Sequence, residues 1–249
     1  MGRLEGKVAF ISGATRGPGR RHAVRLASAG ADIVAVDASG RIDTVDHPLA
    51  TVDEFERTIA QVEERGRTIV ASFVDVRDRQ GLRAAVDDGV RRLGRLDLVV
   101  AVTGNLPVAG ADSRARFVDA VDADLIGVMN TVAVCLPHLK PGSSIVVVIT
   151  SAAPGTARGT PAPEPTGRTW ARRAVMRYVD ALARQLVPHG IRVHTVHETV
   201  GECGRDSDNT FSEVASTRAE HEVGIVRRAA DNCDPIGGRP GEADLDVLP

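Results

Sequence analysis

The chain has 249 residues, a formal net charge of −2 at pH 7, 43% apolar residues and 26% charged residues. This length allows one large domain with a sizeable core, and the composition is that of an ordinary globular protein. A net charge so close to zero gives no long-range attraction to nucleic acid or to an anionic membrane. No apolar run reaches the roughly 18 residues of a membrane span, and the N-terminus carries no apolar signal stretch.

The three cysteines, Cys135, Cys203 and Cys233, are widely spaced and form no C-x-x-C pair. This pattern fits a reducing compartment and indicates neither a disulfide framework nor a thiolate metal site. His194 and His197 lie close together, but no further ligand type accompanies them, so we expect no metal site. We expect a cytoplasmic protein that binds a small molecule and neither nucleic acid nor membrane.

Short runs rich in Val and Ile alternate with longer amphipathic stretches along the chain. The strand-like runs cover residues 8–11, 33–36, 69–74, 98–102, 145–149 and 191–196, and the helical patterns include 22–29, 52–65, 81–93 and 172–186. The runs lack strict polar alternation, which is typical of strands covered on both faces. The order predicts an α/β fold: one Rossmann-type, doubly wound parallel sheet spanning residues 1–249. Pro- and Gly-rich stretches at 152–167 and about 199–212 are expected to be loops.

The first strand-like run leads into the sequence SGATRGPG and then into a helix that we expect to start near Arg20. Glycines in such a turn let a pyrophosphate approach the backbone and the helix N-terminus. The second run ends in Asp37, whose carboxylate would accept hydrogen bonds from ribose hydroxyls and repel a 2′-phosphate, which favours NAD over NADP. The candidate cofactor-binding residues of this half are Gly13, Thr15, Arg16, Gly17, Pro18, Gly19, Asp37 and Ala38.

Together with Asp75-Val76, Gly94-Arg95-Leu96-Asp97 and Pro188-His189-Gly190-Ile191-Arg192-Val193, these motifs resemble the short-chain dehydrogenase/reductase family. The similarity runs from Lys7 to about Val196. More narrowly, His47-Pro48-Leu49-Ala50-Thr51 resembles the mycofactocin-associated, carveol dehydrogenase-like subfamily. That resemblance implies an insertion at residues 38–52 that covers a tightly bound NAD. It also implies that Asp75 and Val76 border the adenine and that Thr103 and Gly104 pass beside the cofactor, although the usual Asn of this turn is missing.

The family works with an Asn, a Ser, a Tyr and a Lys, and this sequence departs from that set. The resemblance places Asp124 at the Asn position, Ser151 at the Ser position, Arg168 at the Tyr position and Arg172 at the Lys position. The two arginines keep the i,i+4 spacing and share a helix face. After the sixth strand the usual Pro is replaced, so that His197 is followed by Glu198-Thr199. The candidate catalytic residues are Ser151, Arg168, Arg172, Asp124 and His197, with Arg172 also near the nicotinamide ribose.

A guanidinium group, with a pKa above about 12, does not exchange a proton near neutral pH as a tuned phenol does. We therefore expect first an NAD-binding enzyme of redox-neutral chemistry, such as cyclisation, rearrangement, dehydration or isomerisation of a natural product. An NAD-dependent alcohol dehydrogenase or ketoreductase that uses Asp124 or His197 instead is the second hypothesis. A catalytically silent NAD-binding regulator or partner subunit is the third, in which Arg168 and Arg172 pair with Asp124 or Glu164.

The remaining features concern the surface and the end of the chain. Arg20-Arg21 and Arg172-Arg173 are interpreted as solvated charge, and Trp170 as a stacking or packing residue. The family normally adds a further helix and a seventh strand, and we expect six strands here, with the sixth at the sheet edge. A variable segment at 199–249 or a second subunit would cover that edge. The helices around 118–138 and 170–187 are expected to form a homodimer or homotetramer interface.

Overall fold

The computed structural model describes residues 2–40, 49–103, 113–152 and 167–200. These residues form one parallel sheet with the strand order β3-β2-β1-β4-β5-β6. The strands are β1 Val8–Ser12, β2 Asp32–Asp37, β3 Ile69–Phe73, β4 Leu98–Thr103, β5 Ser144–Ala152 and β6 Arg192–Val200. The order reverses between β1 and β4, where a doubly wound sheet binds its ligand at the carboxyl ends of the strands. The predicted Rossmann-type α/β fold with a sheet of six strands is confirmed.

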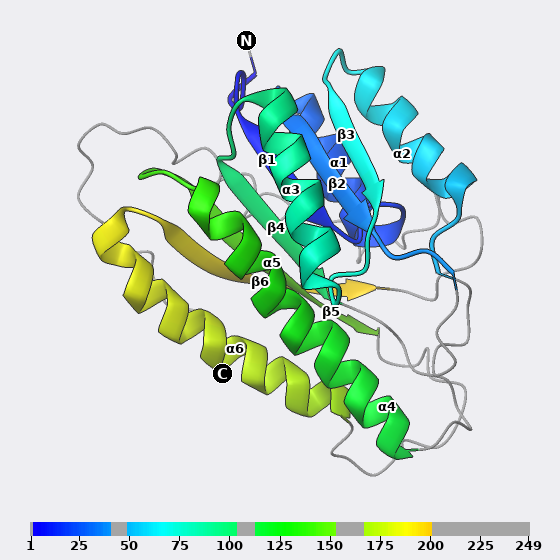
Figure 1. Cartoon of the computed structure of the whole chain (residues 1–249), viewed down its shortest axis with the longest axis vertical. Helices are drawn as coiled ribbons and strands as arrows, with labels where there is room; N and C mark the ends of the chain where they lie inside the picture. Colours follow the sequence, from blue (N-terminus) through cyan, green and yellow to red (C-terminus); the bar gives the residue numbers. More distant parts are fainter. Residues whose placement is uncertain (1, 41–48, 104–112, 153–166, 201–249) are drawn as a thin grey trace.

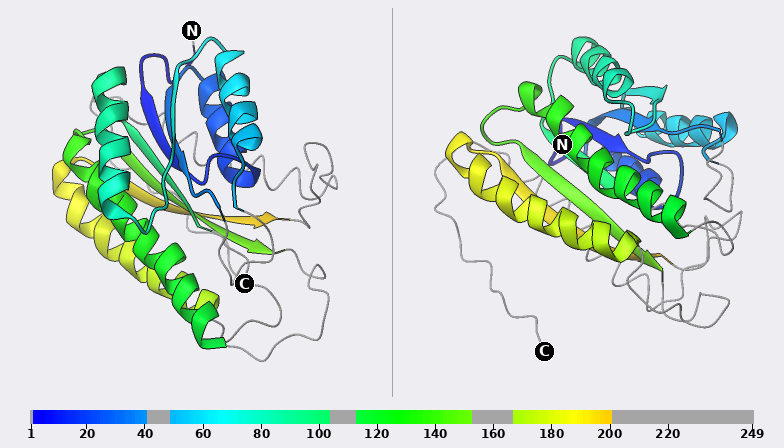
Figure 2. Two further views of the ribbon diagram at one scale, coloured as in Figure 1. Left: turned by 45° about the vertical axis from the view of Figure 1, so that its right-hand side comes forward. Right: turned by 60° about the horizontal axis from the view of Figure 1, so that its bottom comes forward.

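Helices cover both faces of the sheet (Figure 1). They are α1 Gly17–Ser28, α2 Val52–Glu63, α3 Arg79–Leu93, α4 Ser113–Ala120, α5 Gly127–Cys135 and α6 Gly167–Leu186. A π-helical turn, η1 Val121–Ile126, joins α4 to α5, and short 3-10 turns, η2 Leu136–His138 and η3 Val187–His189, follow α5 and α6. Two views in Figure 2 show α1 and α2 on one side of the sheet, and α3, α5 and α6 on the other.

Two apolar cores lie on the two faces, and neighbouring strand residues alternate between them. Val193 belongs to the core under α3, α5 and α6, whereas Val196 belongs to the core under α1 and α2. The same division separates Ile145 from Val146 on β5. This alternation follows from the two-residue period of a strand, and it explains why the strand sequences are apolar throughout.

Local sequence fixes where the helices begin and end. The Thr51 hydroxyl accepts the N–H of Glu54 at 3.2 Å, and the Glu54 carboxylate accepts the N–H of Thr51 at 3.0 Å, so α2 starts in a capping box. Asp78 caps α3, and α3 ends at Gly94, whose φ of 84° suits only glycine well. These caps hold the helices that carry the carboxyl-end loops of β2 and β3.

The last two strands extend further than the sequence pattern predicts. β6 continues through Thr199 to Val200, so the loop predicted from about residue 199 is wrong at its start. The extension comes from pairing, because Thr150, Ser151 and Ala152 of β5 stand opposite Glu198, Thr199 and Val200. Helix α1 likewise begins at Gly17, before the predicted start near Arg20, since Gly and Pro are well tolerated in a first helical turn.

The expected insertion at 38–52 is described only at its two ends. A parallel bridge joins Ser39 to Ala50, and the N–H of Ala50 donates to the carbonyl of Ala38 at 3.2 Å. Leu49 and Ala50 are buried, and α2 starts at Val52 inside the expected segment. Residues 41–48 lie outside the described part, as does the variable segment beyond Val200, so the cofactor-covering role and the expected cover for β6 stay predictions.

Among the described helices, one stretch, Phe117–His138 through α4, η1, α5 and η2, is long and apolar enough to cross a membrane by length and composition alone. Its mean hydropathy is 1.4 over the best window. The stretch packs against α3 and α6, and Val128, Val132 and Cys135 enter the core beside the sheet. These contacts are those of a core helix of the sheet domain.

Candidate active site and cofactor site

The Gly-rich turn after β1 has a backbone that excludes side chains. Gly13 and Gly17 have φ values of 68° and 55°, in the left-handed region. A Cβ on Gly19 would lie 1.9 Å from the carbonyl oxygen of Gly13. The turn is fixed to the sheet because the N–H of Val102 donates to the Ser12 hydroxyl at 3.0 Å. The exposed N–H groups of the first turn of α1 therefore form an anion-binding cradle that fits a pyrophosphate.

Asp37 stands beside this cradle at the carboxyl end of β2. It accepts hydrogen bonds from the N–H groups of Thr15 and Ala38, both at 2.9 Å, and from the Thr15 hydroxyl. Burial raises the pKa of Asp37 to about 6, although these hydrogen bonds and the charge of Arg16 act in the opposite direction. A carboxylate held in this place fits the hydroxyl groups of an adenosine ribose.

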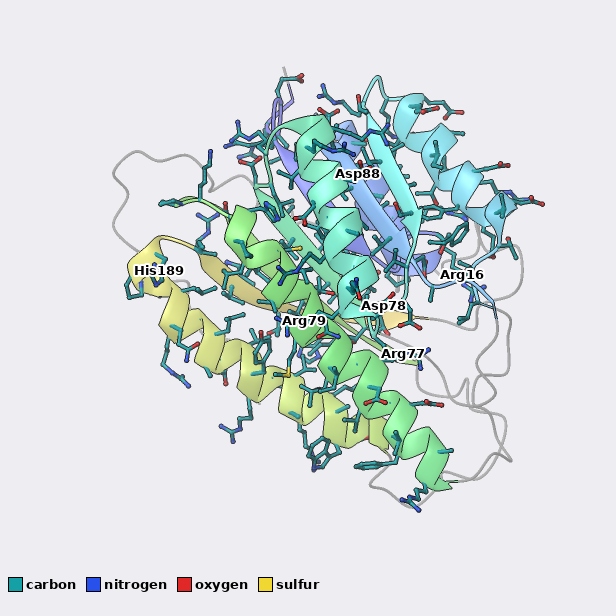
Figure 3. The ribbon with its side chains drawn as sticks, viewed as in Figure 1. Arg16, Arg77, Asp78, Arg79, Asp88 and His189 are labelled. Carbon is teal, nitrogen blue, oxygen red and sulfur yellow. The ribbon has the colours of Figure 1, made fainter. Side chains whose placement is uncertain are left out.

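Asp75 and Val76 follow β3 and so also lie at the carboxyl ends of the strands. Arg77 donates to Asp75 through its backbone N–H at 2.8 Å and through its guanidinium at 2.6 Å. Burial opposes ionisation of Asp75, but these hydrogen bonds hold its pKa below the usual range. The Asn130 side chain of α5 donates to the Val76 carbonyl at 3.0 Å and fixes this loop. In Figure 3, Arg16 and Arg77 lie towards the carboxyl ends of the strands, whereas His189 lies at the far end.

Arg172 of α6 reaches over the carboxyl ends of the central strands. Its guanidinium donates to the backbone carbonyl of Thr150 on β5. The Thr150 hydroxyl donates to the carbonyl of Thr103 at 2.7 Å, which ties β5 to the end of β4. His197 of β6 is near enough to Arg172 that, after partial burial, the charge of Arg172 lowers the pKa of the imidazole. Arg172 and His197 thus both lie near the carboxyl ends of β5 and β6.

Asp124 occupies the π-helical turn η1, which packs against α6. Its side chain is only 2% exposed, so the carboxylate is buried rather than solvated. The turn is wide because the N–H of Gly127 bonds to the carbonyl of Asp122, five residues earlier. Single π-turns within α-helices occur frequently at functional sites. The structure therefore places Asp124 as a buried residue beside α6, and its catalytic role stays a prediction.

The profile of the short chain dehydrogenase family matches residues 7–202. An uncharacterized oxidoreductase of Mycobacterium tuberculosis is 43% identical over 223 residues, covering 87% of this chain and 79% of the relative. The (−)-trans-carveol dehydrogenase of Rhodococcus erythropolis is 38% identical, covering 80% and 72%. The crystal structure of carveol dehydrogenase from Mycobacterium avium in complex with NAD superposes with a TM-score of 0.72 at 32% identity, covering 92% and 91%. The chain belongs to the short-chain dehydrogenase family.

Two of the family's four catalytic positions are only partly described in this short-chain dehydrogenase. Ser151 lies near the end of β5, and Arg168 is the second residue of α6, one turn before Arg172. The side chains of Ser151 and Arg168 lie outside the described part, as do Gly104 and Glu164. The replacement of Tyr and Lys by two arginines therefore stays a prediction. The centroid of the Trp170 ring lies 5.8 Å from that of the Phe117 ring on α4, so Trp170 packs against an aromatic side chain.

The interpretation of Arg20 and Arg21 as solvated charge is wrong. Arg20 donates from its guanidinium to the Thr15 carbonyl and to the Thr58 hydroxyl, both within about 3 Å, and so ties the Gly-rich turn of the short-chain dehydrogenase to α2. Arg21 donates to the carboxylate of Glu198 on β6. Nothing in the local helix pattern distinguishes these arginines from exposed ones, because their partners lie far away in the chain.

Two residues, the acidic Glu198 and the basic His22, were not predicted as functional. Glu198 is 1% exposed and His22 of α1 is 1% exposed, and their side chains approach each other at 3.4 Å. The only sequence signal is that Glu198 replaces the Pro that the family carries after the sixth strand. A charged residue at the end of a buried strand, where the family carries Pro, indicates that its charge is paired with a residue from elsewhere in the fold.

Proposed function

We propose that this protein is an NAD-dependent dehydrogenase that interconverts a secondary alcohol and a ketone on a small alicyclic substrate. The similarity to the (−)-trans-carveol dehydrogenase over 80% of the chain supports this reaction class better than the redox-neutral chemistry expected first. Asp37 supports NAD over NADP, because its carboxylate would repel a 2′-phosphate. A cytoplasmic location belongs to the same proposal.

The residues present fit the cofactor. The tight turn requires glycine at both places, because a Cβ on Gly19 would lie 1.9 Å from the Gly13 carbonyl oxygen and Gly13 has a left-handed φ of 68°, and Asp37 offers acceptors to a ribose. Bound NAD supplies the acceptor or donor of hydride. Arg172, together with Thr103 and Thr150 at the carboxyl ends of β4 and β5, would hold the nicotinamide half of the dinucleotide.

The observation that carries the proposal is the place of His197 on β6: it stands opposite Ile149 of β5, next to Thr150, whose carbonyl accepts a hydrogen bond from Arg172. Because the pKa of His197 is lowered from 6.5, its imidazole is neutral at pH 7 and is able to accept the proton of an alcohol. The guanidinium of Arg172 keeps its proton and stabilises negative charge that develops on the substrate oxygen. In the reverse direction the imidazolium returns the proton to the oxygen.

The test is turnover of (−)-trans-carveol or cyclohexanol by the NAD-saturated protein, followed by the near-ultraviolet absorbance of the reduced nicotinamide. His197→Gln removes the base and is expected to lower kcat/KM by about 10² to 10⁴. His138→Gln is the matched control, because His138 pairs with Asp87 on the surface at 2.8 Å. Full activity of His197→Gln would exclude the imidazole as the base.

Redox-neutral conversion of a substrate is the second candidate, and the fixed guanidinium of Arg172 favours it, because a permanent cation stabilises an enolised oxygen without exchanging a proton. Product formation, detected by mass spectrometry with no change in nicotinamide absorbance, would establish this reaction instead. Binding of NAD with no conversion of any alcohol or ketone tested would support the silent regulator.

We also propose that the protein forms a homo-oligomer through the helices α4, α5 and α6. Exposed large apolar side chains lie on these helices and on the turn η1 between α4 and α5: Phe117, Val118, Ile126, Met129, Trp170 and Met176. The helices pack against each other and run side by side across one face of the molecule (Figure 2). A contiguous exposed apolar surface of this kind is typical of a protein interface.

A further inference from the structure

A buried ionic cluster joins the last strand to the phosphate-binding helix. The carboxylate of Glu198 on β6 accepts a hydrogen bond from the Arg21 guanidinium and lies 3.4 Å from Nε2 of His22. Glu198 and His22 are each 1% exposed, and Arg21 is half-buried. Burial alone would favour the neutral acid, but His22 and Arg21 together hold the pKa of Glu198 below its usual range. The strand therefore carries a buried carboxylate that is anchored to α1.

The cluster lies where the sheet needs an additional constraint. Within the described residues β6 is the last strand and pairs only with β5. A parallel strand with one neighbour is held in register from one side, and a slip of one residue turns every side chain to the opposite face. The anchored carboxylate opposes such a slip, because a slip would place the charge of Glu198 in the apolar core under α6.

This constraint acts most directly on the preceding residue, His197. Val193 faces the core under α6 and Val196 faces the core under α1, so odd and even positions of β6 point in opposite directions. Glu198 follows the even positions and contacts α1. His197 follows the odd positions and points to the side of α6, and it stands opposite Ile149, the neighbour of Thr150, whose carbonyl accepts a hydrogen bond from Arg172 of α6. Fixing Glu198 on one face therefore fixes the imidazole on the other.

We propose that Glu198, through its ion pair with Arg21 and its contact with His22, is a positioning residue that holds His197 on the side of α6, near Arg172. The catalytic meaning of this arrangement rests on the proposed dehydrogenase function, whereas the positioning itself does not. Stability is not the main consequence of such a cluster, since buried ion pairs contribute little net stability compared with apolar residues of the same size. The main consequence is that the end of β6 pairs with β5 in one register only.

The test compares Glu198→Gln with the wild type in NAD-saturated protein, with Asp88→Asn as the matched control. Like Glu198→Gln, Asp88→Asn removes a carboxylate that pairs with arginine, but this pair lies on the surface of α3, away from β6. The main measurement is the titration of the His197 imidazole by NMR, assigned with His197→Gln. In Glu198→Gln we expect the pKa of His197 to rise toward its ordinary value of 6.5, and the acid limb of the kcat/KM profile to shift with it. The control leaves both unchanged.

A second variant separates positioning from stability. Glu198→Gln is expected to lower Tm by about 10 °C, because it leaves Arg21 without its carboxylate in a buried place. Arg21→Met/Glu198→Gln removes both charges and is expected to recover most of this loss, while the His197 titration stays shifted. An unchanged titration of His197 in either folded variant would overturn the proposal. If the titration shifts but His197→Gln stays fully active, the positioning holds and the imidazole is excluded as the base. If the titration shifts but no alcohol or ketone is turned over, the positioning holds and the dehydrogenase proposal fails.

Discussion

The raised pKa of Asp37 predicts that the affinity for NAD depends on pH in a defined range. Burial makes the ionised carboxylate less favourable in the apo protein than in water, whereas ribose hydroxyls donate to the ionised form. Binding therefore requires loss of the proton, and the affinity falls as the pH falls through about 6. With a pKa of about 6, the carboxyl is ionised in roughly one molecule in eleven at pH 5, so the apparent affinity is about tenfold lower than at pH 8, or about 1.4 kcal/mol.

Isothermal titration calorimetry with NAD at several pH values between 5 and 8 measures how the affinity changes with pH. Asp37→Asn is the decisive variant, because the amide still accepts a hydrogen bond from a ribose hydroxyl but does not titrate. Its affinity is expected to be lower at pH 8 and flat across the range. If the wild type and Asp37→Asn lose affinity equally on acidification, another group is responsible and the assignment of the ribose to Asp37 fails.

Further outcomes follow from the packing around the cradle and from the helix surface. Gly19→Ala is expected to abolish NAD binding measured by calorimetry, because its Cβ would lie 1.9 Å from the Gly13 carbonyl oxygen, and retained affinity would contradict the close approach. Arg20→Met removes the bonds to Thr15 and Thr58 and is expected to cost about 2 kcal/mol in urea unfolding, whereas Arg173→Met, an exposed control on α6, costs less than about 0.5. Met176→Glu is expected to convert an oligomer to a monomer in sedimentation velocity; an unchanged sedimentation coefficient would exclude this face as the interface.

The strands of the sheet could be predicted from the sequence because the apolar residues of each strand lie in one short segment of the chain. Each strand carries a short Val- and Ile-rich run, and both faces are apolar because helices cover both. The strand ends could not be predicted in the same way. Thr150 and Glu198 are polar, yet they belong to strands because they stand opposite each other in the pairing of β5 with β6. Pairing is a property of two segments, and one segment alone does not reveal it.

The same distinction separates the predicted part of the site from the part that was missed. The Gly-rich turn and Asp37 lie close together in the chain and follow a known spacing, so their role is readable from a single stretch. Arg21 and Glu198 are separated by 177 positions, and only the fold brings them together. A helix pattern that places arginine near its start gives no indication of whether a distant carboxylate will reach it.

The wide turn at η1 has a consequence for the evolution of this chain. A π-turn holds one residue more than an α-turn, and here the extra residue lies between two helices with different tasks. Loss of one residue within 121–126 would leave α5 seated on the sheet through Val128 and Val132 and would rotate α4 by about 100°. Asp124 would then leave its buried place. A single deletion is thus enough to displace Asp124 and α4 while the contacts of α5 with the sheet are kept.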